Sequence, residues 1–320
     1  MSLLDGPEPV LADRPTAAGL PAPGLPAPEE SSIGRRSPLA LGTRRYLRNW
    51  LAVIGGVVLI AVLLTAFALP LVMHLDPYAI DLRHTRQPPG HGHLLGTDGT
   101  GRDVFARLVY GGRISIGVGL AAAALAIIIG AALGSIAGTF GGWIDMMIMR
   151  TADIFLSFPS IVVVIVLAGI FGPSVWMLIV ALGVFVWPTT GRVVRGVVIT
   201  VREREFVQAA RAVGAGRGWL ITRHLLPAAL SQIVVIFTLT VANCILQEAA
   251  LSFLGLGVQP PRPSWGNMLT SAQGVTVISS MPWLWLPPGI AVALIVLCVN
   301  FVGDGLRDAV DPRQQSGRQS

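Results

Sequence analysis

The sequence has no lysine and few charged residues of either sign. All 23 basic residues are arginines, whereas a phosphate-binding loop of the GxxxxGK(S/T) type needs a lysine to reach the β- and γ-phosphates of a nucleotide. An ATPase loop of this type is therefore excluded from the chain. Charged residues make up only 12% of the sequence and hydrophobic residues 53%, a balance that is rare in water-soluble domains and predicts a membrane protein.

The sequence also offers little that would bind metal or nucleic acid. Its two cysteines, Cys244 and Cys298, lie in apolar runs, where a free cysteine usually behaves as a small buried hydrophobic residue. His91 and His93 form an H-x-H pair, but a metal site usually needs more ligands. The arginines form no basic stripe with interleaved aromatic residues, so we expect no nucleic-acid partner. We predict no metal site and no cofactor in this chain, with metal capture by the histidine pair as a less favoured alternative.

Residues 1–49 differ in composition from the rest of the chain. They are rich in proline, alanine and glycine and show almost no apolar periodicity, so we predict a disordered extension. Residues 50–306 then form a transmembrane domain, and residues 307–320 form a short tail. A signal peptide is the less favoured interpretation, because the apolar run Leu51–Val72 is too long for the apolar core of such a peptide.

Apolar runs long enough to cross a bilayer dominate the transmembrane domain. A helix needs about 20 apolar residues to span the hydrocarbon core, and most of the runs reach or approach this length. The pattern predicts an all-α, polytopic membrane protein with six transmembrane helices. The six predicted spans are Leu51–Val72, Ile114–Ala137, Met149–Phe171, Ser174–Thr190, Ala229–Leu256 and Trp285–Val302.

The arginines predict how these spans are oriented. Cytoplasmic loops carry an excess of positive charge, and 17 of the 23 basic residues fall on one side if the N-terminus is cytoplasmic. We therefore predict that both termini are cytoplasmic. Two loops, about Leu75–Arg113 and Gly257–Leu284, then face outward, and one large loop, about residues 191–228, faces the cytoplasm.

The large cytoplasmic loop has a helical pattern of its own. Good helix formers run from Arg202 to Val213, with Gly214 as a C-cap, and a second helical stretch runs from Gly218 to Leu226 and ends at Pro227. Apolar residues recur on one face of the first helix. They are Phe206, Ala209, Ala210 and Val213.

The same loop resembles a family signature. Gln208-Ala209-Ala210, then Gly214, then Leu226-Pro227 resemble the EAA–three residues–G–nine residues–I-x-L-P signature of bacterial ABC-importer permeases. Gln208 replaces the glutamate and His224 the isoleucine of that signature. The resemblance implies a type I ABC-importer permease fold, with a coupling helix that docks on a separate ATPase subunit. The residues assigned to ATPase coupling are Glu205, Phe206, Gln208, Ala209, Ala210, Arg211, Gly214, Leu226 and Pro227.

Two outer segments narrow the resemblance to one subfamily. Residues 93–115 are similar to the HPLGTDxxGRDxxSRLIYGARxSL stretch, and residues 251–266 to the LSFLGLGxQPPxPSWG stretch, of the C-type subunit of dipeptide, oligopeptide and nickel importers. Asp103 is also placed to cap a short helix ahead of the second span. The outer-loop motif consists of Gly96, Thr97, Asp98, Gly101, Arg102 and Asp103.

The resemblance implies partners and a role. It implies a heterodimer with a second permease subunit in the bacterial inner membrane, two ATPase subunits that bind ATP and Mg, and an extracytoplasmic substrate-binding protein. The chain itself would not be an enzyme. Dipeptides or oligopeptides are the expected substrates, with nickel or another small solute as the alternative. A self-sufficient channel or secondary transporter is the main competing hypothesis, and a membrane-embedded enzyme is less favoured because no nucleophile–base pattern is present.

Two carboxylates fall inside predicted spans and need partners or a water-filled cavity there. Asp153 follows Arg150 by three residues, so we favour a structural ion pair. Glu248 lies beside a polar stripe of the fifth span, and a functional and a structural role stay equally open for it. The candidates for the translocation pathway are Thr240, Asn243, Gln247 and Glu248.

Overall fold

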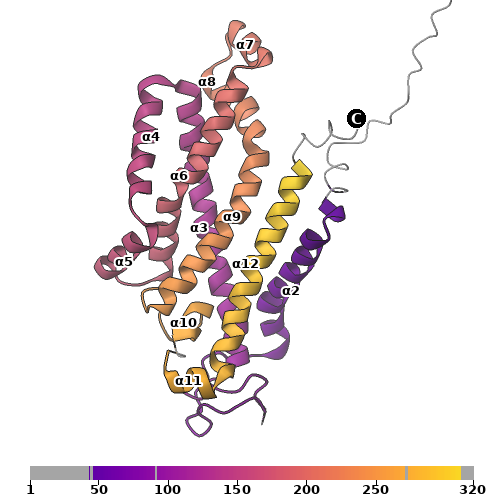
Figure 1. Cartoon of the computed structure of the whole chain (residues 1–320), viewed down its shortest axis with the longest axis vertical. Coiled ribbons are helices and arrows are strands. Elements are labelled where there is room, and N and C mark those ends of the chain that lie inside the picture. The colour runs from indigo at the N-terminus through magenta and orange to yellow at the C-terminus, as the bar shows by residue number, and fades with distance from the viewer. Residues whose placement is uncertain (1–42, 44–45, 91, 271–272, 311–320) are drawn as a thin grey trace, which may run out of the picture. The chain divides into compact units, whose positions relative to one another are not determined.

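The computed structural model describes residue 43 and residues 46–90, 92–270 and 273–310. Within these residues every regular element is a helix and no strand occurs (Figure 1). The described residues all belong to one compact unit. The predicted disordered extension lies almost wholly outside them. The last helix reaches Val310, so the predicted tail begins as helix and its remainder lies outside the described residues.

Five helices are long and apolar enough to cross a membrane, and a bent pair gives a sixth span if it is counted as one. The prediction of six spans is confirmed in that sense. The five are α2 (Trp50–Met73), α3 (Val104–Phe140), α6 (Val175–Arg202), α9 (Leu226–Phe253) and α12 (Pro282–Val310). Helix α8 (Arg217–Leu220) and the π-turn η1 (Ile221–Leu225) precede α9 without a break.

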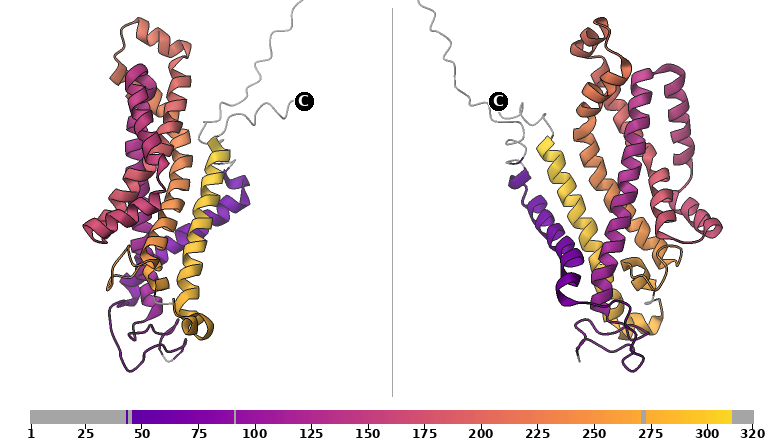
Figure 2. Two further views of the ribbon diagram at one scale, coloured as in Figure 1. Left: turned by 60° about the vertical axis from the view of Figure 1, so that its left-hand side comes forward. Right: turned by 180° about the vertical axis from the view of Figure 1, so that it is seen from behind.

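The third span is not one straight helix, so the prediction of a single helix over Met149–Phe171 is wrong. The chain forms α4 (Gly142–Ser157) and α5 (Ser160–Phe171), which meet at an angle of 82°. Pro159 lies at the break, and Phe158 before it is extended, with φ −106° and ψ 134°. A residue before proline is driven out of the helical region by the proline ring. Figures 1 and 2 show that α5 consequently points sideways from the other helices.

The second span begins ten residues earlier than the predicted Ile114. Asp103 caps it, since its Oδ1 accepts a hydrogen bond from the Ala106 backbone N–H at 2.7 Å. The short helix expected ahead of this span is therefore its first turns. At a rise of about 1.5 Å per residue, α3 exceeds the ~30 Å thickness of the hydrocarbon core. Arg107 and Arg113, expected in a loop, lie on this helix.

Small residues let α3 pack closely against α6. Gly130, Gly134 and Gly138 recur every four residues along α3 and are buried. A Cβ atom at Gly134 would overlap the Gly191 carbonyl oxygen, and one at Gly138 would lie 2.7 Å from a methyl group of Val198. Glycine at this spacing is typical of close helix contacts in membranes. The α3–α6 pair thus provides a fixed frame for the segments at both ends of the bundle.

The bundle has two distinct ends. The first, which we name the α7 end, carries residues 202–220 with α7 (Glu205–Ala212). The other, the loop end, carries residues 74–90, 92–103, 254–270 and 273–281 with α10 (Trp265–Thr270) and α11 (Val275–Ser280). The start of α2 and the end of α12 both point toward the α7 end (Figure 1). This grouping matches the predicted division of loops, and the direction of the bundle across the membrane stays a prediction.

Candidate functional site

The predicted coupling segment forms a short helix that extends beyond the bundle. Helix α6 continues past the predicted end of the fourth span at Thr190 and reaches Arg202. Only Glu203 and Arg204 separate it from α7. The Gln208 side chain closes this turn, because its Nε2 donates to the Glu203 carbonyl oxygen at 3.1 Å. The helix is thus attached rigidly to α6, although it is shorter than the predicted Arg202–Val213.

The predicted C-cap role of Gly214 is confirmed. Its φ of +92° lies in the left-handed region that favours glycine. The Gly214 N–H donates to the Arg211 carbonyl at 2.9 Å, and the Ala215 N–H donates to the Ala210 carbonyl at 3.0 Å. These two bonds define a Schellman motif, which satisfies the last carbonyl groups of the helix. The chain therefore turns sharply at Gly214 and re-enters the bundle through α8.

The apolar face of α7 points mostly away from the bundle. Phe206 is 48% exposed and Val213 90% exposed, and Ala209 is exposed as well. Val207, which the pattern missed as a buried residue, is fully buried in an apolar cluster with Leu220 and Leu225. Glu205 and Arg211 are exposed and Ala210 is half-buried. The helix therefore combines one buried anchor with an uncovered apolar face.

The second helical stretch does not end at Pro227, so that prediction is wrong. The Leu226 N–H bonds the Ile221 carbonyl across a π-turn, and α9 continues directly. Pro227, which has no N–H for a helical hydrogen bond, follows directly on this π-turn, where the α-helical bond pattern is already interrupted. The His224 ring lies 4.9 Å from the Trp219 ring and 5.8 Å from the Phe206 ring. His224 thus packs between aromatic residues in place of the isoleucine of the signature.

The four residues of the polar stripe predicted on α9 differ in their exposure. Thr240 and Glu248 are buried, Asn243 is exposed, and Gln247 is half-buried and accepts a hydrogen bond from the Ser160 hydroxyl at 3.1 Å. Asn243 is therefore the member of the stripe that is open to contact from outside the chain.

Glu248 belongs to a buried polar cluster near the loop end. Its Oε1 accepts a hydrogen bond from the Ser252 hydroxyl at 2.7 Å, and Ser252 Oγ accepts one from the Val258 N–H at 3.0 Å. Its other oxygen, Oε2, is buried and has no hydrogen-bond partner within the described residues. The carboxyl group thus positions Ser252 of α9, whose hydroxyl holds the backbone of the segment that leads toward α10.

The outer-loop motif folds into one compact turn. Asp98 Oδ1 accepts from the N–H groups of Thr100 and Arg102 at 2.8 and 3.0 Å. Thr97 is fully buried, and its hydroxyl donates to the His84 carbonyl oxygen. Gly96 and Gly101 have φ of +74° and +79°, and a Cβ atom at Gly101 would overlap the Asp81 carbonyl oxygen. The glycines of the motif are thus needed for backbone geometry.

One histidine of the predicted H-x-H pair has a partner. His93 Nδ1 lies 2.7 Å from Asp103 Oδ2, so the residue that caps α3 also holds this ring. His91 lies outside the described residues. Across the part of the chain that the structure describes, no group of three or more His, Cys, Asp or Glu side chains could hold a metal ion.

Ion pairs connect the broken third span to α6. Asp153 lies 3.6 Å from Arg150, as the spacing predicts, and 2.5 Å from Arg192. Asp145 pairs with Arg195 at 2.5 Å. The α6 partners were missed because the fourth span was expected to end before them. The structural interpretation of Asp153 is confirmed, with Arg192 as its nearer partner.

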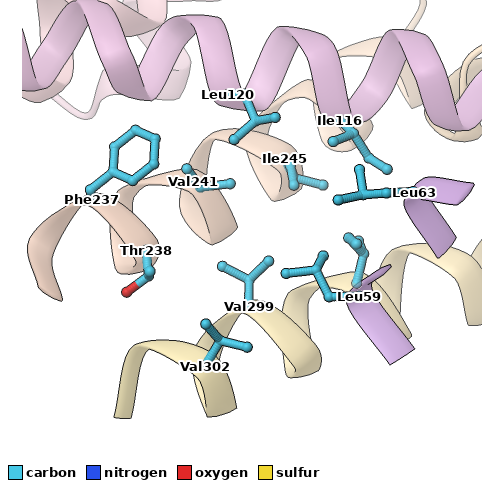
Figure 3. A pocket seen from close by; sticks show the side chains of 11 residues that line it. Leu59, Leu63, Ile116, Leu120, Phe237, Thr238, Val241, Ile245, Val299 and Val302 are labelled. Carbon is cyan, nitrogen blue, oxygen red and sulfur yellow. The ribbon is translucent and has the colours of Figure 1, made fainter. Parts of the chain in front are cut away.

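A cavity of about 130 Å³ lies between α2, α3, α9 and α12. Figure 3 shows apolar side chains from all four helices, including Leu63, Ile116 and Val299, around it. Thr238 is the polar residue in its lining, and its hydroxyl already donates to the Val235 carbonyl. The cavity therefore offers apolar contacts and no free group for a polar solute.

The sequence matches two families of transport-system membrane proteins. Residues 130–316 match the family described as "Binding-protein-dependent transport system inner membrane component", and residues 37–89 match the "N-terminal TM domain of oligopeptide transport permease C". A putative peptide permease protein of Brucella suis is 45% identical over 278 residues, which cover 87% of this chain and 92% of the relative.

Two further relatives cover nearly the same length. The dipeptide transport system permease protein DppC of Alkalihalophilus pseudofirmus is 42% identical over 92% of this chain and 96% of its own. A glutathione transport system permease protein of Pectobacterium atrosepticum is 37% identical over 91% of this chain and 96% of its own length. The chain therefore belongs to the family of binding-protein-dependent transport system inner membrane components and is a multi-pass protein of the inner membrane.

Proposed function

We propose that this chain forms half of the translocation pathway of an ABC importer for peptides. Its partners are a second, related permease subunit, two ATPase subunits and an extracytoplasmic binding protein that delivers the substrate. ATP and Mg bind to the ATPase subunits, and this chain is not an enzyme. The absence of lysine supports this division, because the chain has no residue for the phosphate contact of a P-loop.

The uncovered apolar face of α7 carries the proposal of ATPase docking. Phe206, Ala209 and Val213 are exposed on a helix that projects beyond the other helices (Figure 1). An apolar helix face that lies beyond the bundle is typical of a segment that fits into a groove of a partner. Val207 and the turn at Gly214 hold that face in a fixed position, so movement of the ATPase can be passed to α6 and α9.

Co-purification of the ATPase with full-length variants tests the docking role. Val213→Asp places a charge in the proposed contact, and we expect ATPase recovery to fall about tenfold or more, the effect of burying an unpaired charge. Gly214→Val strains the left-handed turn, and we expect substrate-stimulated ATP hydrolysis to fall. The matched control is Glu203→Gln, which changes an exposed residue outside α7 and should leave both recovery and hydrolysis unchanged. Unchanged recovery and hydrolysis in both variants would refute docking through α7.

The polar stripe on α9 is the proposed border of the pathway. Asn243 is the exposed member, Gln247 joins α9 to Ser160 at the start of α5, and Thr240 and Glu248 support the stripe from inside the chain. Polar side chains on a transmembrane helix are costly and typically mark a functional face.

Peptides are the favoured substrates because the relatives carry the names peptide, dipeptide and glutathione permease. Nickel or another small solute is the alternative, and a self-sufficient transporter or channel is less favoured. Uptake of labelled dipeptide by cells with and without the gene decides between the substrate classes, and co-purification of the ATPase with the chain tests the alternative of a self-sufficient transporter. Loss of dipeptide uptake on deletion supports the proposal. Unchanged dipeptide uptake with loss of nickel uptake would overturn the substrate class.

A further inference from the structure

A polar cavity at the loop end has no part in the proposed function described above. Its volume is about 310 Å³. It lies between the outer-loop motif, the segment around α10 and the start of α12. Its lining residues are Arg86, Asp98, Gly99, Thr100, Arg102, Arg107, Pro260, Asn267 and Leu284.

The charges around this cavity are unbalanced. Three guanidinium groups, those of Arg86, Arg102 and Arg107, face one carboxylate, that of Asp98. Asp98 is largely used within the chain, because its Oδ1 accepts hydrogen bonds from the Thr100 N–H, the Thr100 hydroxyl and the Arg102 N–H. Its Oδ2 lies 3.5 Å from Arg107 Nε. The cavity therefore keeps an excess of positive charge.

Two buried guanidinium nitrogens have no hydrogen-bond partner. They are Nη1 of Arg107 and Nε of Arg102. Arg107 is only 5% exposed, and a buried charged donor without an acceptor costs more free energy than a neutral one. The amide of Asn267 is directed elsewhere, because Nδ2 donates to the Val258 and Arg262 carbonyls and Oδ1 accepts from the Ser264 N–H. The two guanidinium nitrogens can therefore donate to an acceptor from outside the chain.

We propose that this cavity is a carboxylate-binding site, in which a carboxylate accepts hydrogen bonds from Arg107 and Arg102. The planar guanidinium group matches the two oxygens of a carboxylate. The volume accommodates the terminus of a short peptide, and the carboxylate side chain of a protein docked at the loop end offers the same chemistry. The peptide arm of the proposal rests on the side chains of this chain alone, whereas the protein arm rests on the proposed transport function.

Binding of alanylalanine to the full-length protein in lipid nanodiscs tests the proposal, measured by saturation-transfer difference NMR. We expect binding that alanylalaninamide, which lacks the free carboxylate, does not reproduce. Arg107→Gln should weaken it about tenfold or more, the usual effect of losing a hydrogen bond to a charged group. The matched control is Arg83→Gln, on the same loop and outside the cavity lining, which should leave binding unchanged.

A second variant keeps the test decisive if Arg107→Gln does not fold. Asp98→Asn retains the Oδ1 acceptor of the turn and removes the competing negative charge, so alanylalanine should bind about threefold to tenfold more tightly. Equal binding in wild type, Arg107→Gln and Asp98→Asn would overturn the site. Displacement by phosphate at lower concentration than by acetate would overturn the carboxylate assignment.

The protein source of the carboxylate is tested separately if wild type binds no alanylalanine. Docking of the extracytoplasmic binding protein should then weaken with added salt and with Arg107→Gln, and not with Arg83→Gln. Failure of both experiments would overturn the carboxylate site. The docking role of α7 is measured on the ATPase and is unaffected by that failure.

Discussion

The two ends of the bundle differ in how strongly hydrogen bonds contribute to joining their segments. At the α7 end, Val207, Leu220 and Leu225 form an apolar cluster that anchors α7. At the loop end, hydrogen bonds of Ser252 and Trp265 join α9 and α10 to their neighbours, together with those of Asn267. Apolar contact is non-directional, whereas each hydrogen bond requires a particular geometry. The segments of the loop end are therefore positioned mainly by directional contacts, and α7 is positioned mainly by its apolar anchor.

The largest expected effect comes from removing the main anchor of the loop end. Trp265 is buried, its Nε1 donates to the Leu108 carbonyl at 2.9 Å, and its ring lies against Gly112 of α3. Trp265→Ala should lower the free energy of unfolding by about 3–5 kcal/mol. The thermal midpoint of the purified protein in detergent measures the loss.

The matched variant at the α7 end is Trp219→Ala. Trp219 is half exposed and contacts the His224 ring, so its removal should cost less than about 1 kcal/mol. Equal destabilisation by the two tryptophan variants would break the distinction between the ends.

A smaller effect is expected from a single tie between α2 and α3. Pro70 lies inside α2 and lacks the N–H that would bond the Ala66 carbonyl. Arg113 replaces that donor, because its Nε donates to the Ala66 carbonyl at 2.6 Å and its Nη2 to the Phe67 carbonyl at 2.9 Å. Arg113→Gln should cost about 1–3 kcal/mol in stability, again measured as a thermal midpoint.

A double-mutant cycle gives this prediction its control. In the Pro70→Ala background residue 70 has an N–H for the Ala66 carbonyl, so Arg113→Gln should cost about 1 kcal/mol less there. Arg211→Gln, an exposed arginine of α7, should have little effect in either background. Additive costs of Pro70→Ala and Arg113→Gln would show that Arg113 does not supply the missing donor.

The features that local pattern controls were predicted from the sequence. Apolar length predicted the spans, and a glycine after an amphipathic run predicted the turn at Gly214. The bend at Pro159 was missed because apolar residues continue on both sides of it and only the proline marks the break. The early start of α3 was missed because Arg107 and Arg113 interrupt the apolar run, and their partners lie on other segments.

In the candidate site, too, local features were predicted from the sequence and contacts between distant segments were not. Local signals predicted the helix α7, but burial of Val207 depends on α8 and η1, which follow in the chain and are brought back against it. Likewise, the cavity lined by Arg107 exists only because residues 86–107 meet Pro260 and Leu284 in space. Contacts between distant segments leave no periodic signal in one sequence.

The smallest expected effect on stability comes from Glu248, where structure and function are hardest to separate. Glu248→Gln keeps the shape of the side chain and an oxygen that can accept the Ser252 hydrogen bond. We expect stability and assembly with the ATPase to be retained. Peptide uptake should fall about tenfold, which corresponds to about 1.4 kcal/mol on the rate-limiting step.

Glu203→Gln, an exposed residue in the turn before α7, is the counterpart at the other end and should change neither stability nor assembly. Unchanged uptake in Glu248→Gln would remove Glu248 from the pathway and leave it as a structural group that positions Ser252, whose hydroxyl binds the Val258 N–H. A loss of both uptake and thermal stability would assign the effect to the hydrogen-bonded cluster, since the carboxyl group would then be needed to hold the loop end together. Only loss of uptake at constant stability supports a role of the carboxyl group in transport itself, because that outcome separates what the group does from what it holds in place.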